Sequence, residues 1–285
     1  MLGNRLLAAT IGVAAVLVAP SPAVAAETLT LTRVVVSSAA SASDNRTVIA
    51  ACPGGMRVIG GGANITGGGN DVHITGMVPN GLTNTYVAKA AEHHATNMPW
   101  TLTAQAVCAE EPDDLWYAHE TVETPANVSS ISDYAFCPPG SVVLGSGALI
   151  TAANPGKLFL TYVKPTGTGN GSQAGAVEMA GGYNSDWKLE TWSVCAAQPA
   201  GWETVFSSSL PNGYQAGFSC PGYKRVTGAG AYISLSLGRL FLVDAQVTSP
   251  LGIPAMPRGT AVTIGAIDSG ATHDWTVKAR AICVT

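Results

Sequence analysis

The sequence predicts an all-β protein made of three homologous antiparallel β units, each stapled by a disulfide and packed with pseudo-threefold symmetry, either β-prism-like or as tandem sandwiches. Three observations predict this class. Short runs rich in Val, Ile, Thr and aromatic residues are broken by Gly, Pro, Asn or Ser, as in strands joined by turns. No window has a sustained helical period with a cap at each end. A Cys-Pro frame recurs three times, at spacings of 85 and then 83 residues.

The N-terminus has the three-part layout of a secretory signal peptide. Arg5 precedes an uncharged apolar stretch, residues 6–18, and two prolines lead into Ala-Val-Ala at 23–25. A stretch of this length is too short to cross a bilayer as a helix, which takes about 20 residues. We therefore expect cleavage after residue 25 and a secreted, extracellular protein without a transmembrane anchor. The Ala-rich leader suggests a bacterial source.

The three β units are expected at residues 26–110, 111–197 and 198–285, with five or six strands each. Every unit contains Cys-Pro followed by G-x-G-A: "CPGGMRVIGGGANIT" from Cys52, "CPPGSVVLGSGALIT" from Cys137 and "CPGYKRVTGAGAYIS" from Cys220. An apolar segment lies in the middle of each unit: "DVHITGMVP", "KLFLTYVKP" and "RLFLVDAQV". Each closes on a Trp-to-Cys segment: "WTLTAQAVC", "WKLETWSVC" and "WTVKARAIC".

The six cysteines permit fifteen pairings, of which two treat the units alike. One pairs cysteines within each unit, and the other links neighbouring units, with Cys52 meeting Cys283. We favour the first, because closing a loop of nearly sixty residues stabilises an exported chain by about 4 kcal/mol in the chain-entropy estimate. The expected pairs are Cys52 with Cys108, Cys137 with Cys195 and Cys220 with Cys283. No C-x-x-C pair occurs, so no zinc site, other metal or cofactor is expected.

The closing segments separate a core face from a variable face. In a strand, Trp100, Trp187 and Trp275 share a side with the closing cysteine, which predicts core tryptophans. The opposite side carries Gln105, Trp192 and Arg280 at corresponding positions, and it is expected to face solvent. The residue type at this position differs among the three units, whereas the core positions stay the same. These three residues are therefore candidate ligand-binding residues. Tyr162 and Tyr183, nearby in sequence, complete the predicted ligand-binding set.

Other motifs are given structural interpretations. The G-x-G-A segments continue as strand, so their glycines are expected to leave room for a close backbone crossing or a large side chain, the core tryptophan being the obvious candidate. The histidines form no cluster by spacing, and His93 and His94 would point to opposite faces of a strand. Trp116 and Trp202 follow the two linkers and are expected to seal junctions between units.

The charge excludes one class of partner. Lys and Arg total 14 against 18 Asp and Glu, a formal net charge of -4. Nucleic acid demands a basic face, so no nucleic-acid partner is expected.

The C-P-x-G, G-x-G-A and W-x7-C frame resembles the β modules of uncharacterised exported bacterial proteins, over about residues 30–285. That resemblance implies a modular architecture and no activity. A weaker likeness, of symmetry alone, is to threefold β-prism lectin-like proteins. Together with the variable face, it favours a noncatalytic, lectin-like protein that binds carbohydrate or cell-envelope polymer. The alternative is a protein-binding module, as part of a secreted assembly or as an inhibitor of an extracellular enzyme. An enzyme is not expected.

Overall fold

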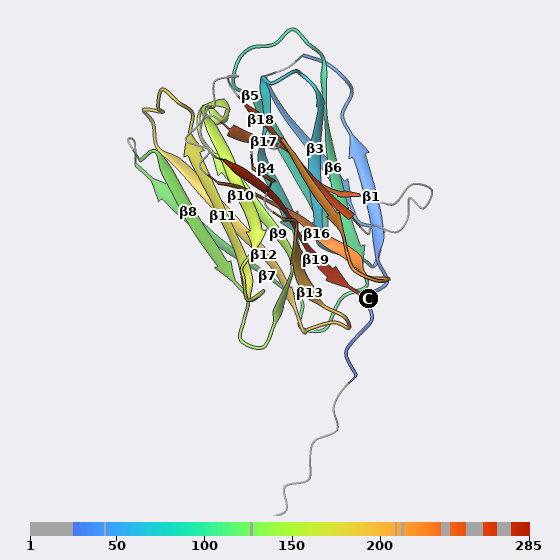
Figure 1. Cartoon of the computed structure of the whole chain (residues 1–285). Helices are drawn as coiled ribbons and strands as arrows, with labels where there is room; N and C mark the ends of the chain where they lie inside the picture. Colours follow the sequence, from blue (N-terminus) through green and yellow to red (C-terminus); the bar gives the residue numbers. More distant parts are fainter. Residues whose placement is uncertain are drawn as a thin grey trace, which may run out of the picture.

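The computed structural model describes residues 25–285 except 43, 126–127, 209, 212–213, 235–239, 249–258 and 267–274. The predicted signal peptide lies outside the described residues apart from its last position. The described chain forms strands β1 to β19 and a single 3-10 turn, η1 (Pro155–Lys157), with no α-helix. The all-β prediction is confirmed. All strand pairs are antiparallel, and they make three sheets that pack together (Figure 1).

Sheet A has the order β1-β6-β3-β17-β18-β15. Its strands are β1 (Thr32–Ser37), β6 (Trp100–Ala109), β3 (Arg57–Gly67), β17 (Leu240–Thr248), β18 (Gly259–Ala266) and β15 (Gln215–Ser219).

Sheet B has the order β2-β5-β4-β9-β12-β7. Its strands are β2 (Asn45–Ala51), β5 (Thr85–Glu92), β4 (Val72–Asn80), β9 (Val142–Thr151), β12 (Trp187–Ala196) and β7 (Trp116–Thr124).

Sheet C has the order β13-β19-β16-β10-β11-β8, and β14 also pairs with β19. Its strands are β13 (Glu203–Phe206), β14 (Leu210–Pro211), β19 (Thr276–Val284), β16 (Arg225–Ser234), β10 (Leu158–Pro165), β11 (Gly171–Glu178) and β8 (Ser130–Phe136).

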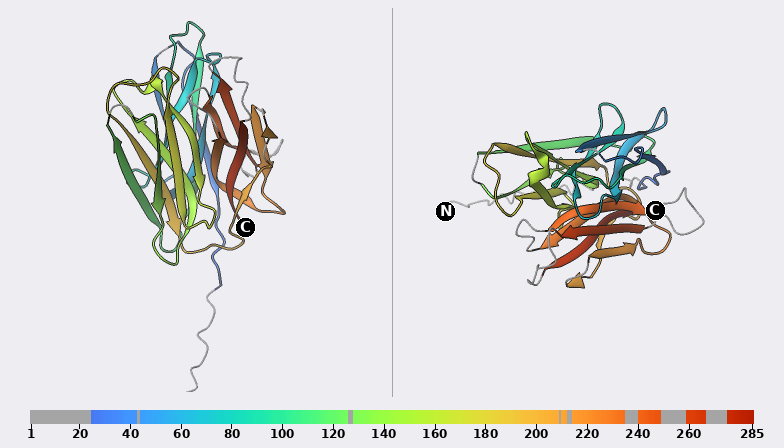
Figure 2. Two further views of the ribbon diagram at one scale, coloured as in Figure 1. Left: turned by 60° about the vertical axis from the view of Figure 1, so that its left-hand side comes forward. Right: turned by 90° about the horizontal axis from the view of Figure 1, so that it is seen from above.

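Each sheet is shared between two of the predicted units. Sheet A joins strands of the first and third units, sheet B of the first and second, and sheet C of the second and third. The joining pairs are β3 with β17, β4 with β9, and β10 with β16. Figure 2 shows the blue-to-cyan, green-to-yellow and orange-to-red parts of the chain gathered around a common centre. The chain is therefore one body rather than a row of separate sandwiches, while the equality of the three units stays a prediction.

The first glycine of each G-x-G-A segment lies where the units meet. A Cβ on Gly60 would collide with the carbonyl oxygen of Thr227, and one on Gly145 would collide with that of Ile59. A Cβ on Gly228 would lie 3.1 Å from the Cα of Gly145. The three glycines thus permit close backbone contacts between β3, β9 and β16. The expected backbone crossing is confirmed at these positions. The prediction that the core tryptophan lies against these glycines is wrong.

The predicted core and disulfides are confirmed. Trp100, Trp187 and Trp275 are at most 2% exposed. The disulfides join cysteines within each unit, as Cys52–Cys108, Cys137–Cys195 and Cys220–Cys283. Each links β6, β12 or β19 to the residues that directly follow β2, β8 or β15 of the same unit.

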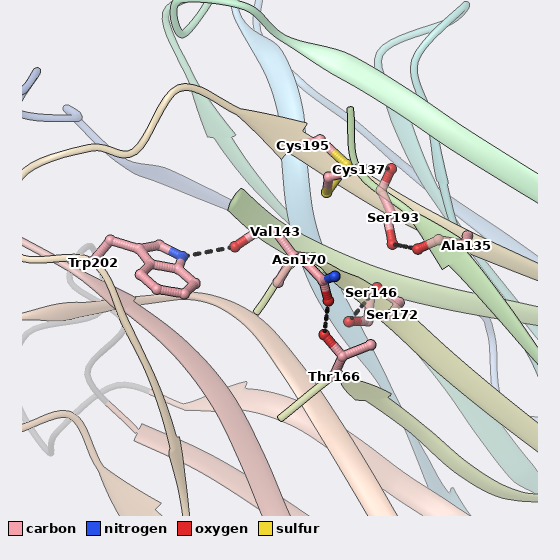
Figure 3. Close-up of a disulfide and its surroundings, with 10 residues drawn as sticks. All are labelled: Ala135, Cys137, Val143, Ser146, Thr166, Asn170, Ser172, Ser193, Cys195 and Trp202. Carbon is pink, nitrogen blue, oxygen red and sulfur yellow. Dashed lines mark hydrogen bonds between the residues drawn. A yellow bond between two sulfur atoms is a disulfide. The ribbon is translucent and has the colours of Figure 1, made fainter. Parts of the chain in front are cut away.

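Hydrogen bonds around Cys137–Cys195 hold sheets B and C together (Figure 3). Ser193 Oγ donates to the carbonyl of Ala135 at 2.7 Å, and Ser172 Oγ donates to Ser146 Oγ at 2.8 Å. Both bonds are buried, where an unsatisfied hydroxyl would cost free energy.

The junction tryptophans differ from each other. Trp202 Nε1 donates to the carbonyl of Val143 at 2.8 Å, so this residue seals the junction between the second and third units as predicted (Figure 3). Trp116 is 58% exposed, and the same prediction is wrong for it. Its neighbour Tyr117 takes that place, because its hydroxyl donates to the carbonyl of Val58 at 2.8 Å.

Candidate functional site

One row of side chains crosses the outer face of sheet C from edge to edge. Registered pairs place Phe206 beside Arg280, Arg280 beside Gly230, Lys164 beside Gln173, and Gln173 beside Tyr134. The β10–β16 register, with Val163 opposite Ala231, puts Lys164 next to Gly230. We call these six residues the sheet C row: Phe206, Arg280, Gly230, Lys164, Gln173 and Tyr134.

The sheet C row faces outward. Residues that alternate with it along the strands, such as Ala279, Val163 and Ala135, are fully buried. Phe206 and Tyr134, at opposite ends of the row, are 61% and 42% exposed. The row therefore lies on the side of sheet C that faces away from the core.

Further aromatic rings lie beside the row. Tyr162 and Tyr232 have ring centroids 5.8 Å apart, and the ring of Tyr162 lies across Gly175, which has no Cβ to obstruct it. Phe136 is 56% exposed and stacks on Tyr134 with an interplanar angle of 5°. These rings give the face a large, rigid apolar area, since aromatic side chains have few rotatable bonds.

The row also carries two half-buried cations. Lys164 Nζ donates to Gln173 Oε1 at 2.7 Å, and Gln173 Nε2 donates to the hydroxyl of Tyr134 at 2.6 Å. Arg280 lies over the ring of Phe206 at 4.9 Å. Desolvation by burial lowers the pKa of both Lys164 and Arg280 and raises the pKa of Tyr162. Among the described residues, neither cation forms an ion pair with a carboxylate.

A hollow of about 570 Å³ lies at one end of this face. Its lining includes Tyr162, Tyr232 and Glu178. Glu178 is 8% exposed; its Oε2 accepts from the backbone N–H of Tyr183 at 3.1 Å, while its Oε1 has no hydrogen-bond partner. The hollow thus combines aromatic walls with a carboxylate whose Oε1 is shielded from solvent.

The predicted ligand-binding residues do not gather in one place. Gln105, Trp192 and Arg280 correspond in the repeat, but they lie in sheets A, B and C respectively. Only Arg280 and Tyr162 belong to the same face. The repeat relates equivalent positions across three sheets, so it separates them in space rather than bringing them together.

Two of the predicted surface residues are buried. Gln105 is 4% exposed, because its amide is occupied by β17: its Oε1 accepts from the backbone N–H of Val247 at 2.8 Å. Tyr183 is 9% exposed, and its hydroxyl accepts from the backbone N–H of Asn154 at 3.2 Å. The expectation that Gln105 faces solvent is wrong, and the candidate ligand-binding residue Tyr183 is buried as well.

Trp192 is half-buried on the outer face of sheet B. Its ring stacks on His119 at 4.5 Å with an interplanar angle of 19°. The pair lines a groove of about 540 Å³ together with Tyr117 and Leu82, which is 98% exposed. This groove is a second concave surface, apart from sheet C.

The histidines cluster, contrary to the expectation from their spacing. His93 and His94 follow the end of β5, where the chain bends and their rings approach to 4.6 Å. With Asp71 they bring three potential metal ligands within 4.8 Å of one another. Burial lowers the pKa of His93 to about 4 and that of its neighbour His73 to about 3. His119 lies on sheet B and does not belong to this cluster.

The sequence signal for the missed residues was local alternation. "SISDYAF" places Tyr134 and Phe136 on one side of β8, and "LFLTYVKP" does the same for Tyr162 and Lys164. The pairing of β10 with β16, from the following unit, had no such signal.

Comparisons with known proteins add no name to this site. No family model matches the chain, and no curated protein matches it in sequence. Within the described residues, no helix has the length and apolar character needed to cross a bilayer.

Proposed function

We propose that this protein is an exported, noncatalytic binding protein that recognises a carbohydrate polymer, such as a polymer of the cell envelope, through the outer face of sheet C. The observation that carries the proposal is the unbroken sheet C row, flanked by the rings of Tyr162, Tyr232 and Phe136. Sugar rings have an apolar face that packs on aromatic rings and a polar rim that hydrogen-bonds to amide, hydroxyl and charged groups. The face offers both kinds of group.

A rigid platform favours this use. The rings stand on paired strands, and Tyr162 is fixed by its contact with Gly175. Little side-chain freedom remains to be lost on binding, which raises the affinity obtained from a given contact area. The span across six strands suits an extended ligand better than a small one.

The noncatalytic assignment follows from the lining groups. Hydrolysis of a glycosidic bond usually needs two carboxyl groups on either side of it. Among the described residues, Glu178 is the one carboxylate that lines the hollow beside the row. Export is supported by the three disulfides, which form and persist in oxidising compartments.

The test is a pull-down of the purified protein on insoluble polysaccharides and cell-wall fractions. Tyr134→Ala combined with Phe206→Ala removes the two exposed rings at the ends of the row, and we expect this double variant to lose most of the binding. Trp192→Ala on sheet B is the matched control and is expected to bind normally. Loss in the control alone would move the site to sheet B, and failure of the unmodified protein to bind any fraction would overturn the proposal.

A protein-binding module is the second candidate, favoured by the sheet B groove. An exposed aliphatic side chain, Leu82, next to the stacked Trp192 and His119 is typical of a protein contact. Affinity capture from culture fluid that recovers one stoichiometric protein, and fails with Trp192→Ala, would support this function instead.

A further inference from the structure

We infer that the polymer bound by the sheet C row is anionic, a polysaccharide that carries carboxylate or sulfate groups. This inference rests on the proposed function and specifies its ligand class. It follows from the charges on the face, their lack of partners and the space between them.

The described charged groups at the outward strand positions of this face are basic, while the carboxylate Glu178 lines the hollow at one end of it. The outward positions of the described sheet C strands hold Lys164 on β10 and, two residues apart on β19, Lys278 and Arg280. The same positions on β8 hold Ser132, Tyr134 and Phe136, without a carboxylate. The whole chain has a formal net charge of -4, so a basic face runs against its overall balance. A local charge opposite to the net charge indicates a specific electrostatic role.

Three cations elsewhere in the described part of the chain have acidic partners. Arg57 pairs with Glu111, Lys188 with Glu123, and Lys224 with Glu203. Lys164, Lys278 and Arg280 form no such pair among the described residues, although all three are partly buried. Partial burial of an uncompensated charge is unfavourable, and an anionic ligand would relieve it.

Arg280 carries a guanidinium without an acidic partner among the described residues. Its Nε is buried, so an anionic ligand would bind the outer nitrogens of the guanidinium instead. A guanidinium binds carboxylate and sulfate through two parallel N–H bonds, which are shorter and stronger than bonds to neutral acceptors. The stacking of Arg280 on Phe206 holds the guanidinium along the face.

Gly230 leaves room between the two central cations. It lies between Lys164 and Arg280 in the row, and a Cβ there would be 3.2 Å from Lys164 Cα and 3.4 Å from Arg280 Cβ. The two cations therefore stand two strand spacings apart, about 10 Å, with bare backbone between them. An anionic group on a sugar can approach both charges while the ring packs on Tyr162 or Tyr232.

The test compares charged polymers with neutral versions of the same backbone. Polygalacturonate is paired with its methyl ester, and dextran sulfate with dextran, in affinity electrophoresis or calorimetry on the full protein. We expect at least one charged polymer to bind about tenfold or more tightly than its neutral partner, and added salt to weaken that binding. Lys164→Gln with Arg280→Gln should abolish the preference. Lys188→Gln, which removes a cation paired with Glu123 on sheet B, should leave it intact.

The outcomes separate this inference from the proposed function. Equal binding of charged and neutral polymers, or an unchanged preference in the folded double variant, would overturn the anionic assignment while polysaccharide binding stands. Failure to bind any of the four polymers and any wall fraction would overturn both. Single-stranded DNA serves as a further probe: binding as tight as to the charged polysaccharide would show a general polyanion site and refute a carbohydrate ligand.

Discussion

Sheets A and C arrange corresponding strands of the predicted units in the same order, but different side chains occupy their outer faces. In sheet A, the position of Arg280 is taken by Gln105 and that of Lys164 by Gln246. These two amides bond to each other at 3.3 Å, and Gln105 also accepts from the N–H of Val247. In sheet C the corresponding cations have no acidic partner among the described residues.

The difference shows how one backbone frame can serve stability in one place and recognition in another. Polar groups that hydrogen-bond to each other, as in sheet A, can be buried, and they then have no free donor or acceptor for a ligand. Cations without an acidic partner among the described residues, set beside aromatic rings as in sheet C, are available to one. The neighbouring residues sharpen this contrast: Asp244, 7% exposed, stands in sheet A where sheet C has Tyr162.

The largest expected effect on stability comes from a substitution where strands of different units make close backbone contact. Gly60→Ala would push a methyl group into the carbonyl of Thr227, where β3 meets β16. We expect the free energy of unfolding to fall by about 3 kcal/mol, since rigid backbone surrounds the site. Urea unfolding measures it. Gly54→Ala is the control, because nothing lies within 4 Å of its Cβ; equal stability of the two variants would contradict the tight meeting of strands.

The next effect separates a structural face from a binding face. Gln105→Ala leaves the buried N–H of Val247 without its acceptor and should cost about 2 kcal/mol of unfolding free energy. Arg280→Gln should change stability by less than about 0.5 kcal/mol while weakening polymer binding. Thermal unfolding and binding measured on both variants check the contrast, and the opposite ranking would refute it.

A third prediction concerns the interior behind the faces. His73 contacts Phe159 of β10 and Phe241 of β17, and burial, with His93 nearby, lowers its pKa from 6.5 to about 3. Below about pH 6.5 the unfolded chain takes up a proton that the folded chain excludes until about pH 3, so the free energy of unfolding falls through this window. His73→Phe should remove up to about 1.4 kcal/mol per pH unit of that decline. Parallel pH profiles for the two proteins would contradict this.

The smallest expected effect is at Trp116. Because its ring is mostly exposed, Trp116→Ala should change the unfolding free energy by less than about 0.5 kcal/mol. Trp202→Ala should cost about 3 kcal/mol, since it removes ring packing and the bond to Val143. Similar losses for both would mean that the two tryptophans seal their junctions alike.

A feature of the structure could be predicted from the sequence when it was determined within one strand or by the repeat itself. Alternation along one strand was enough to place Trp100 in the core, and the repeat was enough to pair Cys52 with Cys108. The burial of Gln105 has its cause in β17, about 140 residues away, which joins β3 through the registered pairs of Asn64 and Ala63. The sheet C row likewise needs β10 beside β16. Pairing between units carries no local signal, so neither the buried amides nor the assembled row was predictable.

The central claim is that the outer face of sheet C is the binding surface, and lysine footprinting tests it most directly. The protein is acetylated with and without the polysaccharide that it retains, and each lysine is followed by mass spectrometry. The account predicts that the polymer slows modification of Lys164 and Lys278, whereas Lys89 and Lys188 on sheet B react as before. Protection of the sheet B lysines with Lys164 and Lys278 unaffected would contradict it.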